Sequence, residues 1–269
     1  MKQLSFIFFI CACMFAMGDA IRSTVGATHS RFVHKSDNGP TASDYIQDGL
    51  ISIWDGEWNG GIGIHDALSP IWKNLIADGA DIPTTLPSLS WGDKCLVRDG
   101  VDGISFLSGI DLSDPISPRT LEIVFSAEGF PVSPSSVYYI FRAETIGTRV
   151  QYASGGKVQV CLRAAGGYID SGLTGPSIET STLSMVGTTT QLLSDIRYAY
   201  YYTNGIKIGQ GLFGRNPDSN PQFELFSTTG RDWPEENIIR IFCIRFYNRA
   251  LTETEVLHNH EIDDARFNQ

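Results

Sequence analysis

IIRIFCIRFYNRALTETEV, residues 238–256, is an apolar run that leads into a polar turn and the start of a helix. Its first half is rich in β-branched and aromatic residues, which is typical of a β-strand. Both faces of such a strand would carry apolar side chains, so we expect a central strand that is covered on both sides. Strict alternation places Ile238, Arg240, Phe242, Ile244 and Phe246 on one face and Ile239, Ile241, Cys243, Arg245 and Tyr247 on the other.

The second half of the stretch predicts where a helix begins. Thr252 is followed three residues later by Glu255, the spacing of a capping box, in which each side chain bonds the backbone N–H of the other residue. Leu251 and Val256 have the positions of a hydrophobic staple across the same helix start. We therefore expect a short helix directly after Thr252.

The rest of the chain is typical of an antiparallel β protein. Short apolar runs alternate with turn dipeptides, and Asn204-Gly205 indicates a type I′ hairpin, in which both central residues need a positive φ. We expect an all-β fold, a two-sheet antiparallel jelly-roll sandwich with a short C-terminal helix. The clearest strands cover residues 121–125, 137–142, 157–163, 198–203 and 206–208.

Composition narrows the class of protein. The chain has 269 residues, of which 42% are hydrophobic, enough for one large core. Its formal net charge is −10 and it contains no run of Lys or Arg. Nucleic acids and anionic membranes both attract basic surfaces, so we expect neither as a partner.

The N-terminus has the layout of a secretory signal peptide. Lys2 precedes an apolar run over residues 4–17, and small residues follow up to Ala20, where we expect cleavage. An alternative is a lipoprotein signal that would leave Cys13 as a lipidated N-terminus. Either reading predicts a secreted or cell-surface protein with no transmembrane segment after signal removal. The predicted parts are a signal peptide at 1–20, a polar tail or linker at 21–43 and a β-sandwich domain at 44–269.

The mature chain would keep three cysteines, Cys95, Cys161 and Cys243. An odd number allows at most one internal disulfide, and the sequence does not decide its pairing. Cys161 and Cys243 both lie in expected strands, which favours burial as small hydrophobic residues.

A glycine-rich loop after the first expected strand is the best candidate for ligand binding. Sugar recognition uses a flat aromatic ring for stacking and planar polar groups for hydroxyls, often on loops of a rigid sandwich. Alternatively, Trp54 ends a core strand, Trp72 packs beneath the loop and the carboxylates only solvate it. The candidate ligand-binding residues are Trp54, Asp55, Glu57, Trp58, Asn59, His65 and Asp66.

Four stretches resemble a known family. Residues 245–252 (RFYNRALT), followed by a short acidic helix, resemble the closing strand of bacterial laminin G-like domains, members of the concanavalin A-like lectin/glucanase superfamily. Residues 49–55 resemble the opening strand of the family, residues 98–107 an internal turn, and residues 200–209 the hairpin that usually precedes the closing strand, and their order adds weight to the resemblance. The resemblance covers about residues 45–267. It implies a concanavalin A-like sandwich that binds a carbohydrate or a cell-surface or matrix protein.

The same resemblance makes Ca²⁺ a possible cofactor, because some laminin G-like domains bind it through carboxylates at the rim. Asp55, Glu57 and Asp66 are the expected ligands, since a hard cation takes several oxygen donors. Asp99 and Asp102 could add to them, but their turn carries Gly103 where the family often has another Asp, and turn aspartates need no metal.

The superfamily includes glucanases, yet the sequence favours a protein without catalysis. The paired carboxylates of a retaining glycosidase would stand on one strand, and Glu122 is alone on its own. No Gly-x-Ser-x-Gly elbow is present. The sequence therefore predicts a non-catalytic extracellular binding module, lectin-like or adhesive. Its alternatives are a structural or protein-interaction surface component and a divergent glycoside hydrolase.

Overall fold

The computed structural model describes residues 39–100, 103–111, 118–129, 137–143, 148–153, 156–162, 167–188, 197–213, 222–228 and 237–268. The chain divides into two units, Met1–Gly39 and Pro40–Gln269, and the second is described below. The predicted signal peptide lies outside the described residues, and so does the predicted tail up to residue 38. The second unit begins with a 3₁₀ turn, η1 (Ala42–Asp44), whose Ala42 is buried. The predicted division into signal peptide, tail and domain stays a prediction.

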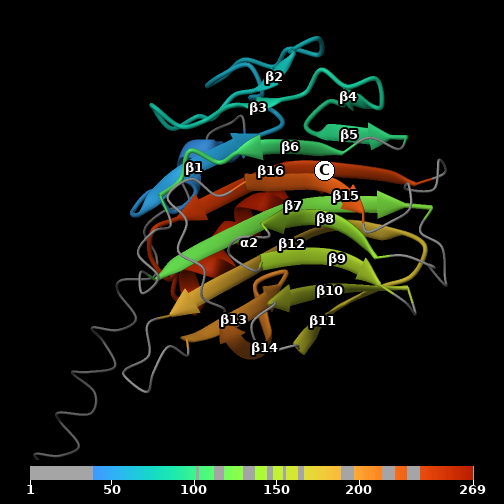
Figure 1. Ribbon diagram of the computed structural model, residues 1–269. Coiled ribbons are helices and arrows are strands. Elements are labelled where there is room, and N and C mark those ends of the chain that lie inside the picture. The colour runs from blue at the N-terminus through green and yellow to red at the C-terminus, as the bar shows by residue number, and fades with distance from the viewer. Residues whose placement is uncertain are drawn as a thin grey trace, which may run out of the picture. The chain divides into compact units, whose positions relative to one another are not determined.

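Two antiparallel sheets make up most of the second unit (Figure 1). The eight-stranded sheet has the order β14 (Ile206–Phe213), β13 (Arg197–Thr203), β12 (Ile178–Thr188), β7 (Arg119–Glu128), β16 (Ile238–Tyr247), β5 (Leu96–Asp99) and β4 (Leu89–Trp91), with β1 (Leu50–Asp55) paired to β16. The six-stranded sheet has the order β11 (Gly167–Thr174), β10 (Lys157–Leu162), β9 (Thr148–Ala153), β8 (Tyr138–Ala143), β15 (Gln222–Thr228) and β6 (Ile104–Leu107). A third, two-stranded sheet joins β2 (Ile71–Trp72) to β3 (Ile82–Pro83).

The main core lies between the two large sheets. It combines buried side chains of the eight-stranded sheet, such as Phe125 and Ile244, with those of the six-stranded sheet, such as Phe141 and Val150. Burying one apolar face of each sheet against the other is the physical basis of a sandwich. The all-β sandwich predicted from the sequence is confirmed.

Strand β16 is central, as predicted, with β7 on one side and β5 and β1 on the other. The predicted alternation of its side chains is wrong beyond Ile241, because a bulge shifts the register with β7 between Ile241 and Cys243. A bulge adds one residue and exchanges the two faces of the strand. Ile239, Ile241, Ile244 and Phe246 therefore all face the main core, whereas Cys243 belongs to a cluster on the opposite face.

The local signals of the sequence are confirmed. Asn204 and Gly205 have φ values of 50° and 74°, as a type I′ turn requires. Helix α2 (Glu253–Phe267) follows Thr252, whose side chain accepts a hydrogen bond from the backbone N–H of Glu255, and the reciprocal bond of the capping box is also present.

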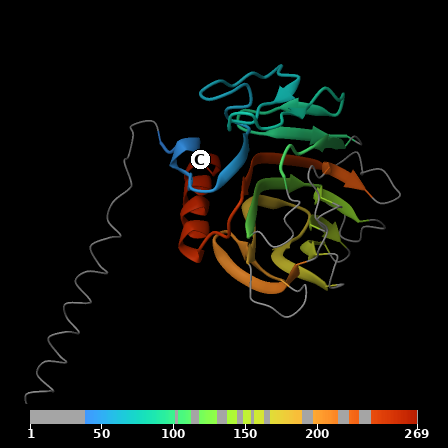
Figure 2. The ribbon, with the colours of Figure 1, turned by 60° about the vertical axis from the view of Figure 1, so that its left-hand side comes forward.

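Helix α2 covers the outer face of the eight-stranded sheet, next to η1 and β1 (Figure 2). Leu251 and Val256 are buried there against Tyr202 and Tyr247 of the sheet. Among the described residues, no helix is long and apolar enough to cross a membrane.

Candidate functional site

A buried ionic network holds α2 to the sheet. Arg245 of β16 donates from Nε to Glu122 of β7 at 2.8 Å, and from Nη1 and Nη2 to the two carboxylate oxygens of Asp263 at 2.6 and 2.7 Å. Burial raises the pKa of Glu122, and the charge of Arg245 opposes this rise. Asn259 donates a further bond to Glu122. These side chains are enclosed between helix and sheet, so Glu122 is not available to a substrate.

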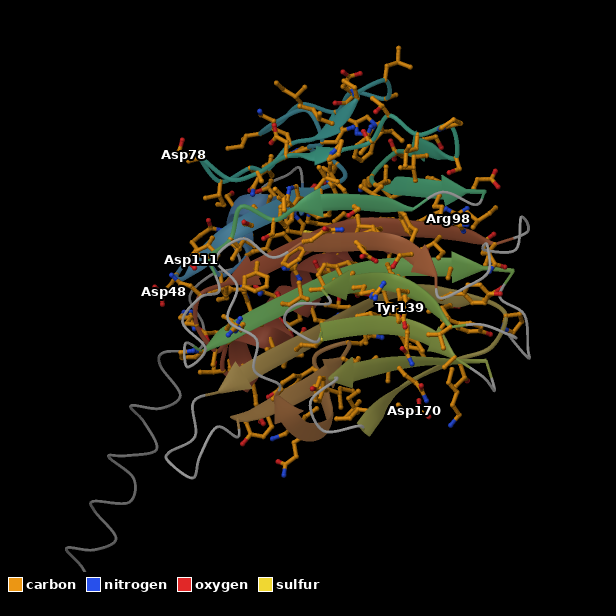
Figure 3. The ribbon with its side chains drawn as sticks, viewed as in Figure 1. Asp48, Asp78, Arg98, Asp111, Tyr139 and Asp170 are labelled. Carbon is orange, nitrogen blue, oxygen red and sulfur yellow. The ribbon has the colours of Figure 1, made fainter. Side chains whose placement is uncertain are left out.

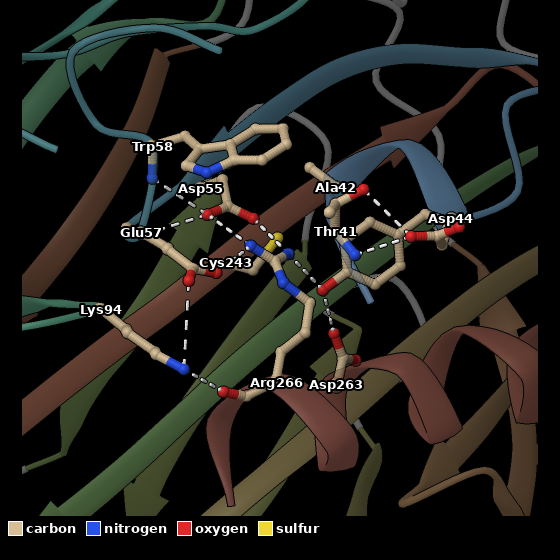
Figure 4. A network of polar contacts seen from close by, with 12 residues as sticks. Thr41, Ala42, Asp44, Asp55, Glu57, Trp58, Lys94, Cys243, Asp263 and Arg266 are labelled. Carbon is tan, nitrogen blue, oxygen red and sulfur yellow. Dashed lines mark hydrogen bonds and ion pairs between the residues drawn. The ribbon is translucent and has the colours of Figure 1, made fainter. Parts of the chain in front are cut away.

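A second buried arginine forms ion pairs with the first two carboxylates of the candidate loop, Asp55 and Glu57 (Figure 4). Arg266 of α2 donates to Asp55 at 2.6 and 3.1 Å and to Glu57 at 2.7 Å. The hydroxyl of Tyr45 connects the two networks, since it donates to Asp263 and accepts from Arg266. Burial raises the pKa of Asp55, while Arg266 lowers it.

The structure thus gives Asp55 and Glu57 an internal cation in place of the predicted Ca²⁺. Asp66, the third predicted ligand, accepts a bond from the backbone N–H of Leu68 in its own turn. Asp102 lies outside the described residues. Within the described ranges, no group of three or more His, Cys, Asp and Glu side chains is placed to hold a metal ion.

The aromatic residues of the loop are also used by the fold. Trp54 has 0% exposure and its Nε1 donates to the carbonyl of Ala80, so its ring is not open to a sugar. Trp58 is half-buried and packs against the cluster around Cys243, with the guanidinium of Arg266 5.9 Å from its ring centre. Of the predicted stacking residues, Trp54 is in the core and Trp58 lies against α2.

The remaining candidates shape the loop itself. Asn59 is fully buried and exchanges two 2.7 Å hydrogen bonds with the backbone of Asp66. His65 is exposed, and its Nδ1 lies 3.1 Å from the carbonyl oxygen of Gly56. The loop is therefore held rigidly, and of the seven predicted residues only His65 and Asp66 are exposed.

A groove that the sequence did not indicate lies beside this loop. It has a volume of about 350 Å³ and is lined by residues 67–70, 84–86, 89–91 and Leu96. Its walls come from the end of the loop, from β3 to β4, and from β5; in Figure 1, β2, β3 and β4 lie together above β5 and β6. A volume of this size is at the lower end of the range for small-molecule sites.

The groove wall contains an aromatic ring in a fixed orientation. Trp91 is half-buried, and its Nε1 donates to the carbonyl of Ser69 at 2.9 Å. Its ring meets the buried ring of Trp72 edge to face, with centroids 5.5 Å apart. These two contacts restrict the rotamer of Trp91, which is what a stacking surface requires.

Four residues with hydroxyl groups line the groove, Ser69, Thr84, Thr85 and Ser90. The Thr84 hydroxyl donates to the Ser69 carbonyl and the Ser69 hydroxyl to the Ile71 carbonyl, so both are held in place. Thr85 and Ser90 are exposed and line the same groove. The site therefore combines an aromatic ring with donors and acceptors at its rim.

Large aliphatic side chains are exposed on the loop next to the groove. Ile62, Ile64 and Leu68 are 70%, 56% and 90% exposed, and Leu68 also forms part of the groove wall. Buried contacts hold the ends of the loop, whereas its tip faces solvent with apolar groups, a pattern associated with binding surfaces.

The sequence did not single out the groove because its walls are distant in the chain. The one local sign is the run Leu86-Pro-Ser-Leu-Ser-Trp91, in which a tryptophan stands among serines and leucines. Nothing in that run shows that residues 67–70 lie opposite it; the pairing of β2 with β3 brings them there.

Cysteine chemistry is not part of the site. Cys95 and Cys243 are both free and buried, as expected for Cys243, while the Cys161 side chain lies outside the described part of the structure.

Comparison with known proteins gives fold relatives only. No protein-family model matches the chain, and no curated protein matches it significantly. Trypanosoma rangeli sialidase in complex with sialic acid is 14% identical with a TM-score of 0.55, over 84% of this chain and 34% of the sialidase chain. The binding domain of botulinum neurotoxin serotype D is 9% identical with a TM-score of 0.57, over 80% of this chain and 52% of that chain.

The chain thus spans about a third of the sialidase and about half of the toxin domain. At these identities the likeness shows the fold and nothing finer. The second unit of this chain is a β-sandwich, and it shares this fold with the sialidase and the toxin binding domain.

Proposed function

We propose that this protein is a non-catalytic carbohydrate-binding module and that the groove at Trp91 holds the sugar. The observation that carries the proposal is the ring of Trp91, held by its contacts with Ser69 and Trp72 in the wall of a groove that the exposed residues Thr85 and Ser90 also line. A pyranose presents an apolar face for stacking and hydroxyls at its edge, which matches this arrangement. The laminin G-like sequence motifs and the shared sandwich fold support the same class of function.

The absence of catalysis is part of the proposal. Glu122 of β7 and Asp55 of β1 are buried and paired with arginines. A glycosidase needs two carboxyl groups that both reach the substrate. The described groove wall contains no carboxylate. We place the protein outside the cell, secreted or at the cell surface, on the signal-peptide layout of residues 1–20.

The test compares Trp91, which lines the groove, with Trp58, which does not. Trp91→Ala should lower affinity for bound glycans about tenfold or more, since loss of an aromatic contact of about 1.4 kcal/mol has that effect. Trp58→Ala lies outside the groove and should keep wild-type affinity in the folded fraction. A glycan array on the purified chain identifies the ligands, and isothermal titration measures them. Binding that survives Trp91→Ala places the sugar elsewhere, and an array without any bound glycan refutes the proposal.

One observation favours a protein partner as a second candidate. Ile62 and Ile64 are exposed aliphatic side chains outside the groove. Protein interfaces bury such groups at their centres. A stable partner that co-purifies with the wild type but is lost with Ile62→Asp would support an adhesive or structural role. Retention of that partner by Ile62→Asp would oppose it.

A further inference from the structure

The groove differs from its surroundings in the charge of its wall. Every residue that lines it is Ala, Leu, Ser, Pro, Thr or Trp, so none of the lining side chains is ionisable. An acidic sugar places a carboxylate in its site, and desolvating a carboxylate costs several kcal/mol unless a cation or several N–H donors receive it. The groove wall offers no side-chain cation for this purpose.

The cations nearby in sequence are committed to other partners. Between residues 56 and 98 the Lys and Arg residues are Lys73, Lys94 and Arg98, and His65 stands in the loop with its Nδ1 3.1 Å from the carbonyl oxygen of Gly56. Lys73 bonds Asp81 at 2.8 Å, and Lys94 donates to the carbonyl of Arg266. Arg98 is fully buried and donates to the carbonyl of Asn237. Recruiting any of them to the groove would break an existing contact.

The negative net charge of the whole protein also disfavours acidic sugars. The formal net charge is −10, and exposed carboxylates project from widely separated points of the surface (Figure 3). A negative surface without a local cation repels anionic ligands and lowers their rate of association. The labelled carboxylates are those of Asp48, Asp78, Asp111 and Asp170.

Leucines supply the rest of the wall. Leu68, Leu86 and Leu89 are exposed or half-buried and line the groove together with the buried Leu96. Aliphatic surface gains free energy when it is covered by a methyl group, at about 25 cal/mol per Å² of apolar area. A sugar that carries a methyl substituent therefore fits this wall better than one with hydroxyls only.

We propose, on the basis of the function proposed above, that the groove selects neutral sugars with an acetamido group, such as N-acetylhexosamines, and rejects acidic sugars. The ring of Trp91 would stack on the pyranose, the hydroxyl of Thr85 would bond its edge, and Leu68 and Leu86 would cover the acetyl methyl. Selectivity follows from a neutral wall, without any repelling group inside the groove.

Titration calorimetry with three probes tests the proposal on the full chain. Chitotriose and cellotriose share β1,4-linked glucose-type rings and differ in the acetamido group; sialyllactose carries a carboxylate. We expect chitotriose to bind about tenfold more tightly than cellotriose, and sialyllactose to show no measurable heat. Leu68→Ser, at a 90% exposed position, should reduce the preference for chitotriose, whereas Ile62→Ser, at a 70% exposed position outside the groove, should leave it unchanged.

The outcomes separate the two proposals. Tight binding of sialyllactose overturns the selectivity, and so does equal binding of the two neutral trisaccharides. Either result leaves a carbohydrate-binding module in place. No binding of any glycan, here and on the array, overturns both. Chitotriose preference that survives Leu68→Ser and falls with Ile62→Ser would also contradict the assignment of the groove.

Discussion

Replacing Asp263 by Asn should destabilise the domain strongly, because this carboxylate is the partner of a buried arginine. Asp263 is 2% exposed and accepts hydrogen bonds from Tyr45, Thr182 and, twice, from Arg245. The side chain of Asn has the same shape but only one acceptor oxygen. Its NH₂ group would face donors that now bond the second carboxylate oxygen of Asp263. Arg245 would be left with Glu122 as its one carboxylate.

The expected cost follows from the burial of the pair. Breaking a buried ion pair by removing one partner costs about 3–5 kcal/mol. For a domain of this size, each kcal/mol lowers the melting temperature by about 2–4 °C, so Asp263→Asn should lower it by about 6–20 °C. Urea unfolding at pH 7, followed by tryptophan fluorescence, gives the change in free energy directly.

The neighbouring residue is a matched control. Asp264 is exposed and bonds Asn268 at the end of the same helix, so Asp264→Asn should change stability by about 0.5 kcal/mol or less. If Asp263→Asn costs as little as Asp264→Asn, the network does not hold α2 to the sheet, and the reasoning fails.

Three further outcomes are expected. Arg249 lowers the pKa of Glu255 to about 2, below its unfolded value, so this pair stabilises the fold above about pH 4.5 and the stabilisation is lost as pH falls toward 2. Glu255→Gln should therefore cost about 1 kcal/mol at pH 7, less than the pKa shift alone implies, because solvent screens this partly exposed pair. Thermal unfolding from pH 2 to 7 should show the variant and wild type converging at the acid end, whereas a constant difference would contradict this. Trp58→Ala should lower the melting temperature because its ring packs beside α2, contrary to the sequence-based expectation of a ligand-binding loop residue; calorimetry without any shift would restore that expectation. Burial raises the pKa of both Cys95 and Cys243, so neither should react with iodoacetamide at pH 8 until urea is added, and mass spectrometry showing rapid native labelling would contradict their placement.

The sequence determined those features that a few neighbouring residues fix. Asn204-Gly205 makes its turn because Gly205 has no Cβ and Asn204 tolerates a positive φ. The helix begins where Thr252 and Glu255 can bond each other's backbone. Apolar runs at strand length then suffice for a sandwich, since each sheet has one face to bury.

Only the tertiary structure decided what the polar side chains do. The sequence predicted Asp55 and Glu57 to be ligand-binding residues of a surface loop. Arg266, their partner, lies more than two hundred residues away and reaches them because α2 folds back on the sheet. The bulge in β16 is likewise seen only in its pairing with β7. The groove at Trp91 arises from chain segments that meet through the pairing of β2 with β3, and such long-range proximity leaves no periodic signal in the sequence.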